Sequence, residues 1–441
     1  MTSLKTSNRP IGIDLFAGAG GLSLGFEQAG FDIAAAVEID PVHCATHEYN
    51  FPNCTTICGS VVDLSGDLIR ERAKIGARDI DVVFGGAPCQ GFSMIGKRAL
   101  DDPRNHLVFH YVRLVKELQP KYCVFENVKG LTLGAHSKFL AELIGALDEA
   151  GYDVLLPYKV LNAAEFLVPQ DRRRLFLIGT RRGLRLPKYP DPKGNVTVGE
   201  AIGDLPDADA FDELVTRDSV VTNWKTKSQY GRRLRGMEDD PENFSYERDF
   251  EINSLTSSMR TEHTELSKSR FIATEAGKTE PVSRFRKLDA DGLCNTLRAG
   301  TDSARGAFTS PRPIHPRYAR VITVREAARL HSYPDWFRFH VTKWHGFRQI
   351  GNSVPPNLGR AVGQEIMSAL GATPKKPTKK IMRNDPSLLE MDMSAAAKYF
   401  GVKNTVIAQR LRKTDKRSES KGSAKLKSQE DKEDTYATDE C

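Results

Sequence analysis

A cysteine and a glutamate in this sequence stand in short motifs that suit covalent chemistry. Cys89 lies in a glycine-rich loop, residues 85–93, that follows the apolar residues 82–84, and Glu126 follows the apolar residues 122–125. Proline keeps the residue before it extended, and glycines let a ligand come close, so the loop presents the thiol. A presented thiolate is a nucleophile, and a neighbouring carboxyl group can donate a proton. Burial of Cys89 as a small core residue explains this segment equally well.

A glycine-rich turn and two acidic residues indicate a bound nucleoside. The turn at residues 16–21 separates the apolar residues 11–15 from a helical pattern, and Glu38 ends the next apolar run. A carboxylate roughly twenty residues after such a turn is placed to bind the hydroxyls of a ribose. Asp63 would accept from an adenine amino group if it lies at a strand end, although a helix cap is an equal alternative. These residues leave a dinucleotide and S-adenosylmethionine both open.

Two arginines complete the set of reactive side chains. Arg172 and Arg174 lead into the apolar residues 175–178, on the rim expected to hold the thiol and the carboxyl group. A solvated sheet edge is the common alternative for such a cluster. Arginine charge near Cys89 would lower the pKa of its thiol from about 8.5 and raise the thiolate fraction.

Together these groups fit methyl transfer to a ring carbon that is not itself nucleophilic. Carbon 5 of cytosine is one: addition of a thiolate at carbon 6 makes the ring an enamine that can attack a methylsulfonium. The addition pushes charge onto ring nitrogen 3, where Glu126 can donate, and an arginine can hold the exocyclic oxygen. Loss of the carbon-5 proton and elimination then release Cys89. A base inside a duplex must be flipped out to be reached.

Strand patterns place all of these side chains where strands end. Apolar runs predict strands at residues 11–15, 33–37, 55–62, 81–84, 122–125, 152–160 and 174–179. Most of them alternate with helical patterns, which is typical of a parallel sheet whose ligands bind at the carboxyl ends, at the switch point. The sequence therefore predicts an α/β fold with a doubly wound, mostly parallel sheet.

The amino-acid composition indicates which kind of binding partner and which cellular compartment to expect. The chain has 441 residues and a formal net charge of +7, which suits an anionic partner without requiring one. Its seven cysteines are scattered, with no secretory signal and no apolar run long enough to span a membrane, so we expect the cytoplasm, in association with the nucleoid. Cys54 and Cys58 are close in sequence but lack further ligands nearby, so we expect no metal site.

The later part of the chain has a different character. Residues 180–285 are polar with interspersed aromatics, which suits nucleic-acid contacts, with a solvated insertion as the alternative. A capping box begins a helix at Thr323. The end of the chain is charged, and we predict disorder from residue 414. Residues 393–413 have the spacing of a helix-turn-helix, and an amphipathic hairpin packed on the body fits equally.

The whole pattern resembles the cytosine-5 DNA methyltransferases of the prokaryotic type. The resemblance covers residues 11–370 in the family's order of motifs. The motifs that carry it are the glycine turn at residues 14–21, Glu38, Asp63, Pro88-Cys89-Gln90, Glu126-Asn127-Val128, the Gln170/Arg172/Arg174 element and Gly351-Asn352-Ser353-Val354-Pro355. It implies S-adenosylmethionine as the cofactor, double-stranded DNA as the partner and a flipped-out cytosine as the target.

The resemblance also implies a role for each matching residue. Cys89 would be the nucleophile, Glu126 would contact the ring nitrogen, and Arg172 and Arg174 would steady the flipped cytosine and its surroundings. The implied cofactor site comprises Phe16 against the adenine, Gly18 and Gly20 near the methionine part, Glu38 on the ribose, Ile39 and Leu64 beside the adenine, Asp63 on its amino group, Pro88 and Leu107, and Asn352 closing the pocket.

The same resemblance implies a division of the chain. We expect a catalytic and cofactor-binding domain at residues 1–182, completed by residues 349–371, and a smaller target-recognition domain at residues 183–348. Residues 372–441 lie outside the family pattern. We expect a monomer, and a cognate restriction endonuclease would be a further partner.

Two other functions share parts of the pattern. Some relatives of this family modify transfer RNA, so an RNA cytosine-5 methyltransferase is one alternative, although the long polar module favours DNA. The helix-turn-helix pattern would suit a DNA-binding regulator with a secondary methyltransferase fold. A dehydrogenase with the same sheet would leave Cys89, Glu126 and the arginines without a shared purpose.

Overall fold

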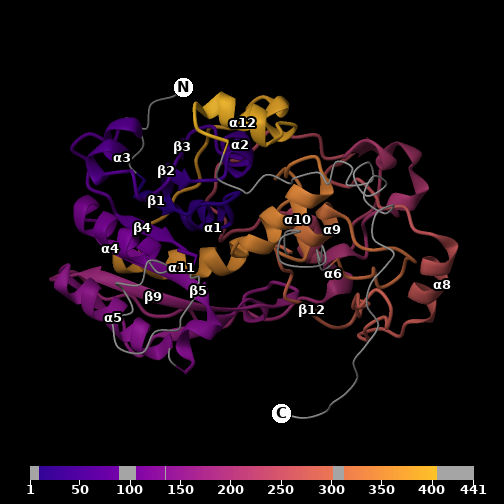
Figure 1. The fold of residues 1–441 in the computed structure, drawn as a ribbon, viewed down its shortest axis with the longest axis horizontal. Helices are drawn as coiled ribbons and strands as arrows, with labels where there is room; N and C mark the ends of the chain where they lie inside the picture. The colour runs from indigo at the N-terminus through magenta and orange to yellow at the C-terminus, as the bar shows by residue number, and fades with distance from the viewer. Residues whose placement is uncertain (1–8, 89–105, 135, 301–311, 405–441) are drawn as a thin grey trace, which may run out of the picture. The chain divides into compact units, whose positions relative to one another are not determined.

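The structure is a computed structural model that describes residues 9–88, 106–134, 136–300 and 312–404 (Figure 1). Cys89 lies outside these ranges. So do the second helix of the predicted helix-turn-helix and the predicted disordered end. All described residues belong to a single compact unit, residues 1–406.

The centre of the described structure is an eight-stranded sheet in the order β3-β2-β1-β4-β5-β9-β6, with β7 beside β9. The strands are β1 (Ile11–Leu15), β2 (Asp32–Glu38), β3 (Thr55–Cys58), β4 (Val82–Gly85), β5 (Tyr122–Val128), β6 (Tyr152–Val154), β7 (Lys159–Asn162) and β9 (Arg173–Arg181). Strands β1 to β5 pair in parallel, and β9 pairs antiparallel with β5, β6 and β7. The order reverses between β1 and β4, so their carboxyl ends diverge into a crevice. The predicted fold class is confirmed.

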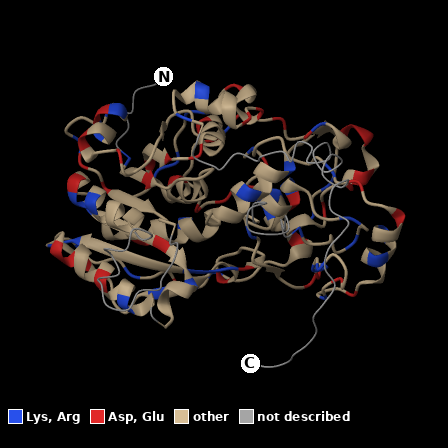
Figure 2. Cartoon of the chain, viewed as in Figure 1, with Lys and Arg blue, Asp and Glu red and all other residues tan. Residues whose placement is uncertain are grey.

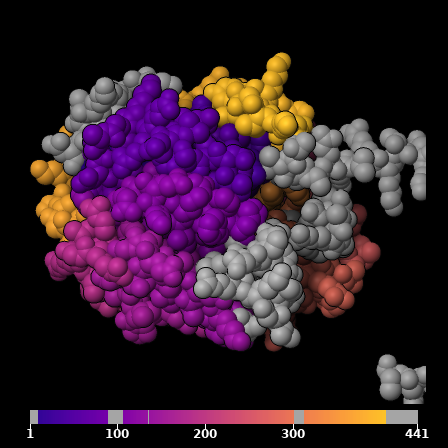
Figure 3. Space-filling view, turned by 60° about the vertical axis from the view of Figure 1, so that its left-hand side comes forward, coloured from indigo at the N-terminus to yellow at the C-terminus, as the bar shows by residue number. Residues whose placement is uncertain are grey.

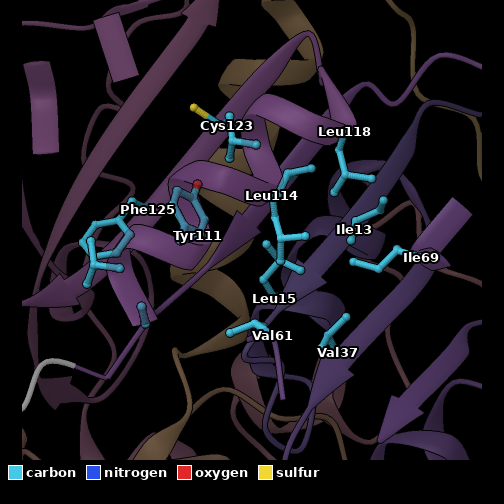
Figure 4. Packing of buried hydrophobic residues seen from close by; sticks show 14 of the residues in the cluster. Ile13, Leu15, Val37, Val61, Ile69, Tyr111, Leu114, Leu118, Cys123 and Phe125 are labelled. Atoms are coloured by element: carbon cyan, nitrogen blue, oxygen red, sulfur yellow. The ribbon is translucent and has the colours of Figure 1, made fainter. Parts of the chain in front are cut away.

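Helices bury both faces of this sheet, which is why its strands are almost continuously apolar. The covering helices are α1 (Gly21–Ala29), α2 (Pro41–Asn50), α3 (Gly66–Arg72), α4 (His106–Leu118), α5 (His136–Glu149) and α11 (Pro356–Ala369). Alternate residues face opposite ways: Phe125 packs with Tyr111 of α4 in one cluster (Figure 4), whereas Val124 joins Phe26 of α1 in the other. Helix α11 packs against α1 although it comes from the far end of the sequence.

Residues 183–348 are loop-rich in the described ranges. Their helices are α6 (Val198–Ile202), α7 (Gln229–Leu234), α8 (Glu265–Ala273), α9 (Val324–Arg329) and α10 (Lys343–Asn352), with the two-residue strands β10 (Val220–Val221), β11 (Ser254–Leu255) and β12 (Cys294–Asn295), the last paired with β8 (Gln170–Asp171). The predicted capping box at Thr323 is present. Buried ion pairs hold the loops together, as when Arg329 pairs with Asp335 at 2.7 Å and with Asp204 at 2.6 Å.

One part of the expected recognition region packs on the catalytic part. Arg248 is fully buried and forms a bidentate ion pair with Glu27 of α1. Tyr246 donates to Asp32 of β2 at 2.9 Å. Residues 239–250 therefore cover α1 and the start of β2.

Residues 372–404 also pack on the body of the protein. Helix α12 (Met393–Phe400) lies against α2, which also contacts the short 3-10 helix Pro386–Leu389 (Figure 1). In the space-filling view, the yellow C-terminal residues of the described chain lie on its indigo N-terminal part (Figure 3). Tyr399 donates to Glu48 of α2 at 2.7 Å. Basic and acidic residues are interspersed along the chain (Figure 2), and Lys376 pairs with Asp239 at 2.6 Å. The first helix of the predicted helix-turn-helix therefore packs on the body of the protein, as the alternative prediction of an amphipathic hairpin expected. None of the helices in the described ranges is long and apolar enough to cross a membrane.

Candidate active site

A pocket opens at the carboxyl ends of β4 and β5, next to the start of β9. The volume of the pocket is about 260 Å³. Its lining consists of Ala87, Glu126, Asn127, Val128, Arg172, Arg174, Thr296, Leu297, Arg298, Ala299, Gly351 and Asn352. The predicted carboxyl group, both predicted arginines and the predicted Asn352 therefore meet at one pocket. Cys89 lies outside the described residues, but Ala87, two residues before it, is in the pocket wall.

Glu126 sits at the end of β5 with its carboxyl group against an arginine. Arg174 Nε lies 2.9 Å from Glu126 Oε1. Gly86 makes room for the other oxygen, because a methyl group at that position would overlap Glu126 Oε2. Burial raises the pKa of Glu126, and the charges of Arg174 and Arg172 oppose that rise without cancelling it. The result is a carboxyl group that can hold a proton and donate it to a base in the pocket.

Asn127 fixes the loop that leads to Cys89. Its side-chain nitrogen donates to the carbonyl oxygen of Ala87 at 3.0 Å, and its side-chain oxygen accepts from the backbone of Val128 at 2.9 Å. Asn127 is buried. The amide therefore couples the end of β5 to the loop after β4, so the two predicted catalytic motifs share one anchor.

Arg172 holds the walls of the pocket together. Its side chain is 1 % exposed. The guanidinium donates to the carbonyl oxygens of Leu297 at 2.9 Å, Gly351 at 2.9 Å and Ser353 at 2.8 Å. Burial and the neighbouring Arg174 lower its pKa. The two arginines were predicted to steady the flipped base and its surroundings. Arg172 contacts only the pocket wall in these hydrogen bonds, which suits the surroundings of the base, whereas Arg174 contacts the carboxyl group of Glu126.

Gly351 lets two of these walls touch. A side chain there would overlap the backbone between Arg298 and Ala299. We expect Gly351→Ala to lower the free energy of unfolding by about 1–3 kcal/mol and to reduce kcat, because the pocket wall must move. Thermal unfolding and steady-state kinetics measure both effects. In the control Gly145→Ala, the new methyl group on α5 meets nothing within 4 Å, so stability should not fall. Wild-type stability and kcat in Gly351→Ala would contradict this packing.

The pocket residues from Thr296 to Ala299 had no predicted role. They follow β12, which pairs with β8 through Cys294 and Gln170. Thr296 Oγ1 donates to the carbonyl oxygen of Asp171 at 2.6 Å, which fixes this wall beside the arginine strand. A two-residue strand such as β12 is too short to show a periodic pattern in the sequence. The one sequence signal for this wall is the return of apolar residues near position 293, after the polar residues 180–285.

The predicted ribose acid lies at the end of β2, beside the glycine turn. Glu38 accepts from the backbone nitrogens of Gly18 at 2.8 Å, Ile39 at 3.0 Å and Asp40 at 2.9 Å. Ile39 is 46 % exposed. A methyl group on Gly18 would meet nothing within 4 Å, so the turn is open above it. An open glycine turn, a carboxylate and an exposed apolar side chain at one sheet edge fit a nucleoside.

Two further predicted cofactor residues have backbones in the left-handed region. Phe16 follows β1 with φ +66° and is half-buried. Such a conformation in a non-glycine residue costs free energy and is common where a ligand binds. Gly20, the residue before α1, has φ +101°. The turn therefore has an unusual backbone path at both ends.

The remaining predicted cofactor residues differ in exposure. Strand β3 ends at Cys58 rather than at residue 62, because Gly59 and Ser60 begin a turn. Asp63 is exposed in this turn, and Ser65 rather than Asp63 caps α3. Leu64 is buried in the core. Pro88 is exposed and Leu107 is half-buried in the first turn of α4. Within the described residues, no cluster of three or more histidine, cysteine or acidic side chains could hold a metal.

Comparison with known proteins places these residues in a family context. The family model for C-5 cytosine-specific DNA methylase matches residues 12–368. The type II methyltransferase M.XorII of Xanthomonas oryzae pv. oryzae is 65 % identical over 408 residues, covering 92 % of this chain and 96 % of that protein. M1.HphI of Haemophilus parahaemolyticus is 35 % identical over 80 % of this chain and 86 % of that protein. The crystal structure of a prophage-encoded E. coli protein described as a DNA modification methyltransferase superposes with a TM-score of 0.69 at 35 % identity, over 82 % of this chain and 99 % of that one.

Proposed function

This chain belongs to the C-5 cytosine-specific DNA methylase family, and on that premise we propose how its residues divide the work of the reaction. The protein is a DNA methyltransferase that acts on carbon 5 of cytosine. The observation that carries the assignment of residues is the pocket in which Glu126 and Arg174 face one another beside Arg172 and Asn352. The family match supports DNA rather than RNA as the substrate.

The flipped-out cytosine enters this pocket with ring nitrogen 3 against Glu126. The raised pKa of Glu126 keeps a proton available for that nitrogen when the Cys89 thiolate adds at carbon 6. Arg174, paired with the same carboxyl group, holds the exocyclic oxygen. Arg172 acts through the carbonyl groups of the pocket wall. After carbon 5 has gained its methyl group, loss of the carbon-5 proton and elimination release the thiolate.

S-adenosylmethionine supplies the methyl group when it is bound. Glu38 would bind its ribose, Phe16 and Ile39 would contact its adenine with Asp63 at the amino group, and Gly18 and Gly20 would lie near its methionine part. The open space above Gly18 and the exposed side chain of Ile39 support this placement. Asn352 closes the site from the other side. Pro88, Leu107 and Leu64 complete its surroundings, Leu64 from the core.

The target and the biological setting follow from the same family. We propose that residues 183–348, apart from residues 239–250, read one short DNA sequence. The type II names of the relatives support a partner restriction endonuclease with the same site. We expect a monomer that acts on nucleoid DNA in the cytoplasm.

Methylation sequencing tests this function. DNA from a methylation-free host that expresses the chain should carry 5-methylcytosine confined to one short motif. Expression of a chain with Glu126→Gln is the control and should leave the same motif almost unmodified. Unmodified DNA with the wild-type chain, or 5-methylcytosine without a sequence preference, would contradict the proposal.

A further inference from the structure

An ion pair joins the two segments that flank the proposed cofactor site. Arg348 Nη1 of α10 lies 2.5 Å from Asp40 Oδ2, which belongs to the loop between β2 and α2. The carboxylate of Asp40 is 3 % exposed and the arginine side chain 22 % exposed. We infer that Arg348 is a positioning residue for S-adenosylmethionine that acts through Asp40, and this inference rests on the proposed site beside Glu38.

Asp40 controls the position of the ribose acid. Its backbone nitrogen donates to Glu38 Oε1 at 2.9 Å. Its side-chain Oδ1 accepts from the backbone of Val42 at 3.0 Å and of His43 at 3.4 Å, which caps α2. Burial alone would raise the pKa of Asp40, but His43 and Arg348 hold it at about 2. The carboxylate is therefore ionised and fixed, and it fixes the loop that carries Glu38 and Ile39.

Arg348 controls the position of the opposite wall. Asn352, the last residue of α10, stands four positions after Arg348, so the two side chains share one face of the helix. Trp344, four positions before Arg348, lies under its guanidinium with 5.5 Å to the ring centre. Gln349 donates to Thr46 of α2 at 2.8 Å, which holds α10 against α2 beside the ion pair. The ion pair thus links the segment that carries Glu38 to the helix that ends at Asn352.

This arrangement has a measurable consequence for cofactor binding. Loss of the ion pair leaves Glu38, Ile39 and Asn352 intact but lets their two segments separate. We therefore expect Arg348→Met to raise the Kd and the KM for S-adenosylmethionine roughly 3- to 30-fold, with kcat and the KM for DNA changed less. Arg348→Lys, which keeps the charge, should restore part of the affinity. Asp40→Asn, which keeps the helix cap, should weaken cofactor binding as Arg348→Met does.

The control is the ion pair between Arg338 and Asp218, at 2.7 Å with 16 % and 10 % exposure, neither of which is hydrogen-bonded or ion-paired to Glu38 or Asp40 in the described chain. Calorimetric titration of the full chain with S-adenosylmethionine, with thermal unfolding in parallel, compares Arg348→Met with Arg338→Met. Weakened binding in the former alone, at similar losses of Tm, supports the inference. Wild-type affinity in Arg348→Met and Asp40→Asn, or equal weakening in Arg338→Met, would overturn it. If the wild-type chain itself fails to bind the cofactor, the proposed function fails instead.

Discussion

Cys89→Ser should bring methyl transfer to DNA below detection while the protein still binds S-adenosylmethionine. A serine hydroxyl is a far weaker nucleophile than a thiolate, so the ring is not activated and carbon 5 cannot take the methyl group. The residues proposed to bind the cofactor do not include Cys89. Transfer of a tritiated methyl group to duplex DNA measures the reaction, and calorimetric titration measures cofactor binding.

A second cysteine provides the control for this substitution. Cys54 is a free thiol and is half-buried, and it lies outside the lining of the pocket at Glu126. Cys54→Ser should therefore retain methyl transfer. Transfer at the wild-type rate in Cys89→Ser, or an equal loss in both variants, would remove Cys89 from the role of nucleophile.

Glu126→Gln should lower kcat by about 10²- to 10⁴-fold. The amide fits the same space but cannot give a proton to ring nitrogen 3. We expect only a small change in the free energy of unfolding, because two effects oppose one another. Burial raises the pKa of Glu126 in the folded protein above its pKa in the unfolded chain. At a pH above the unfolded pKa, this shift lowers the free energy of unfolding. The neutral amide of glutamine removes this unfavourable contribution. Loss of the ion pair to Arg174 acts in the other direction.

The pH dependence separates a proton donor from a structural carboxyl group. In the wild type, the protonated fraction of Glu126 falls as the pH rises through its raised pKa, so the rate of the chemical step should fall there too. Glu126→Gln should lack this limb of the profile. The control Glu149→Gln, at an exposed position on α5, should keep both the rate and the profile. A Glu126→Gln enzyme with the wild-type profile would contradict the proton transfer.

The parts of the fold that local patterns control agree with the prediction. Strands such as β1 and β4 are short, buried and mainly apolar, and a glycine-containing loop follows each, so each was expected within a residue or two of its observed place. The prediction was wrong where an apolar pattern continued across a loop. Residues 152–160 form two strands instead of one, because the loop between β6 and β7 contains Pro157, which has no backbone N–H for the ladder.

The pocket was predictable only in part, for a related reason. Glu126 and Arg174 end up together because the strands that carry them are neighbours, and the motifs indicated both. The wall from Thr296 to Ala299 and the ion pair between Asp40 and Arg348 arise from contacts between distant segments of the chain. Such contacts leave no periodic pattern, so single-sequence reasoning could not find them. The same holds for the packing of α12 on α2.

Duplex DNA with 5-fluorocytosine at the target position gives the most direct test of the proposed mechanism. Fluorine cannot leave carbon 5 as a proton does, so once methyl transfer has occurred the thiolate cannot be eliminated and the protein stays bound to the DNA through carbon 6. We expect a complex that survives denaturation, forms only with S-adenosylmethionine present, and maps by mass spectrometry to Cys89. No stable complex with DNA that the enzyme otherwise methylates, or an adduct on another residue, would contradict it.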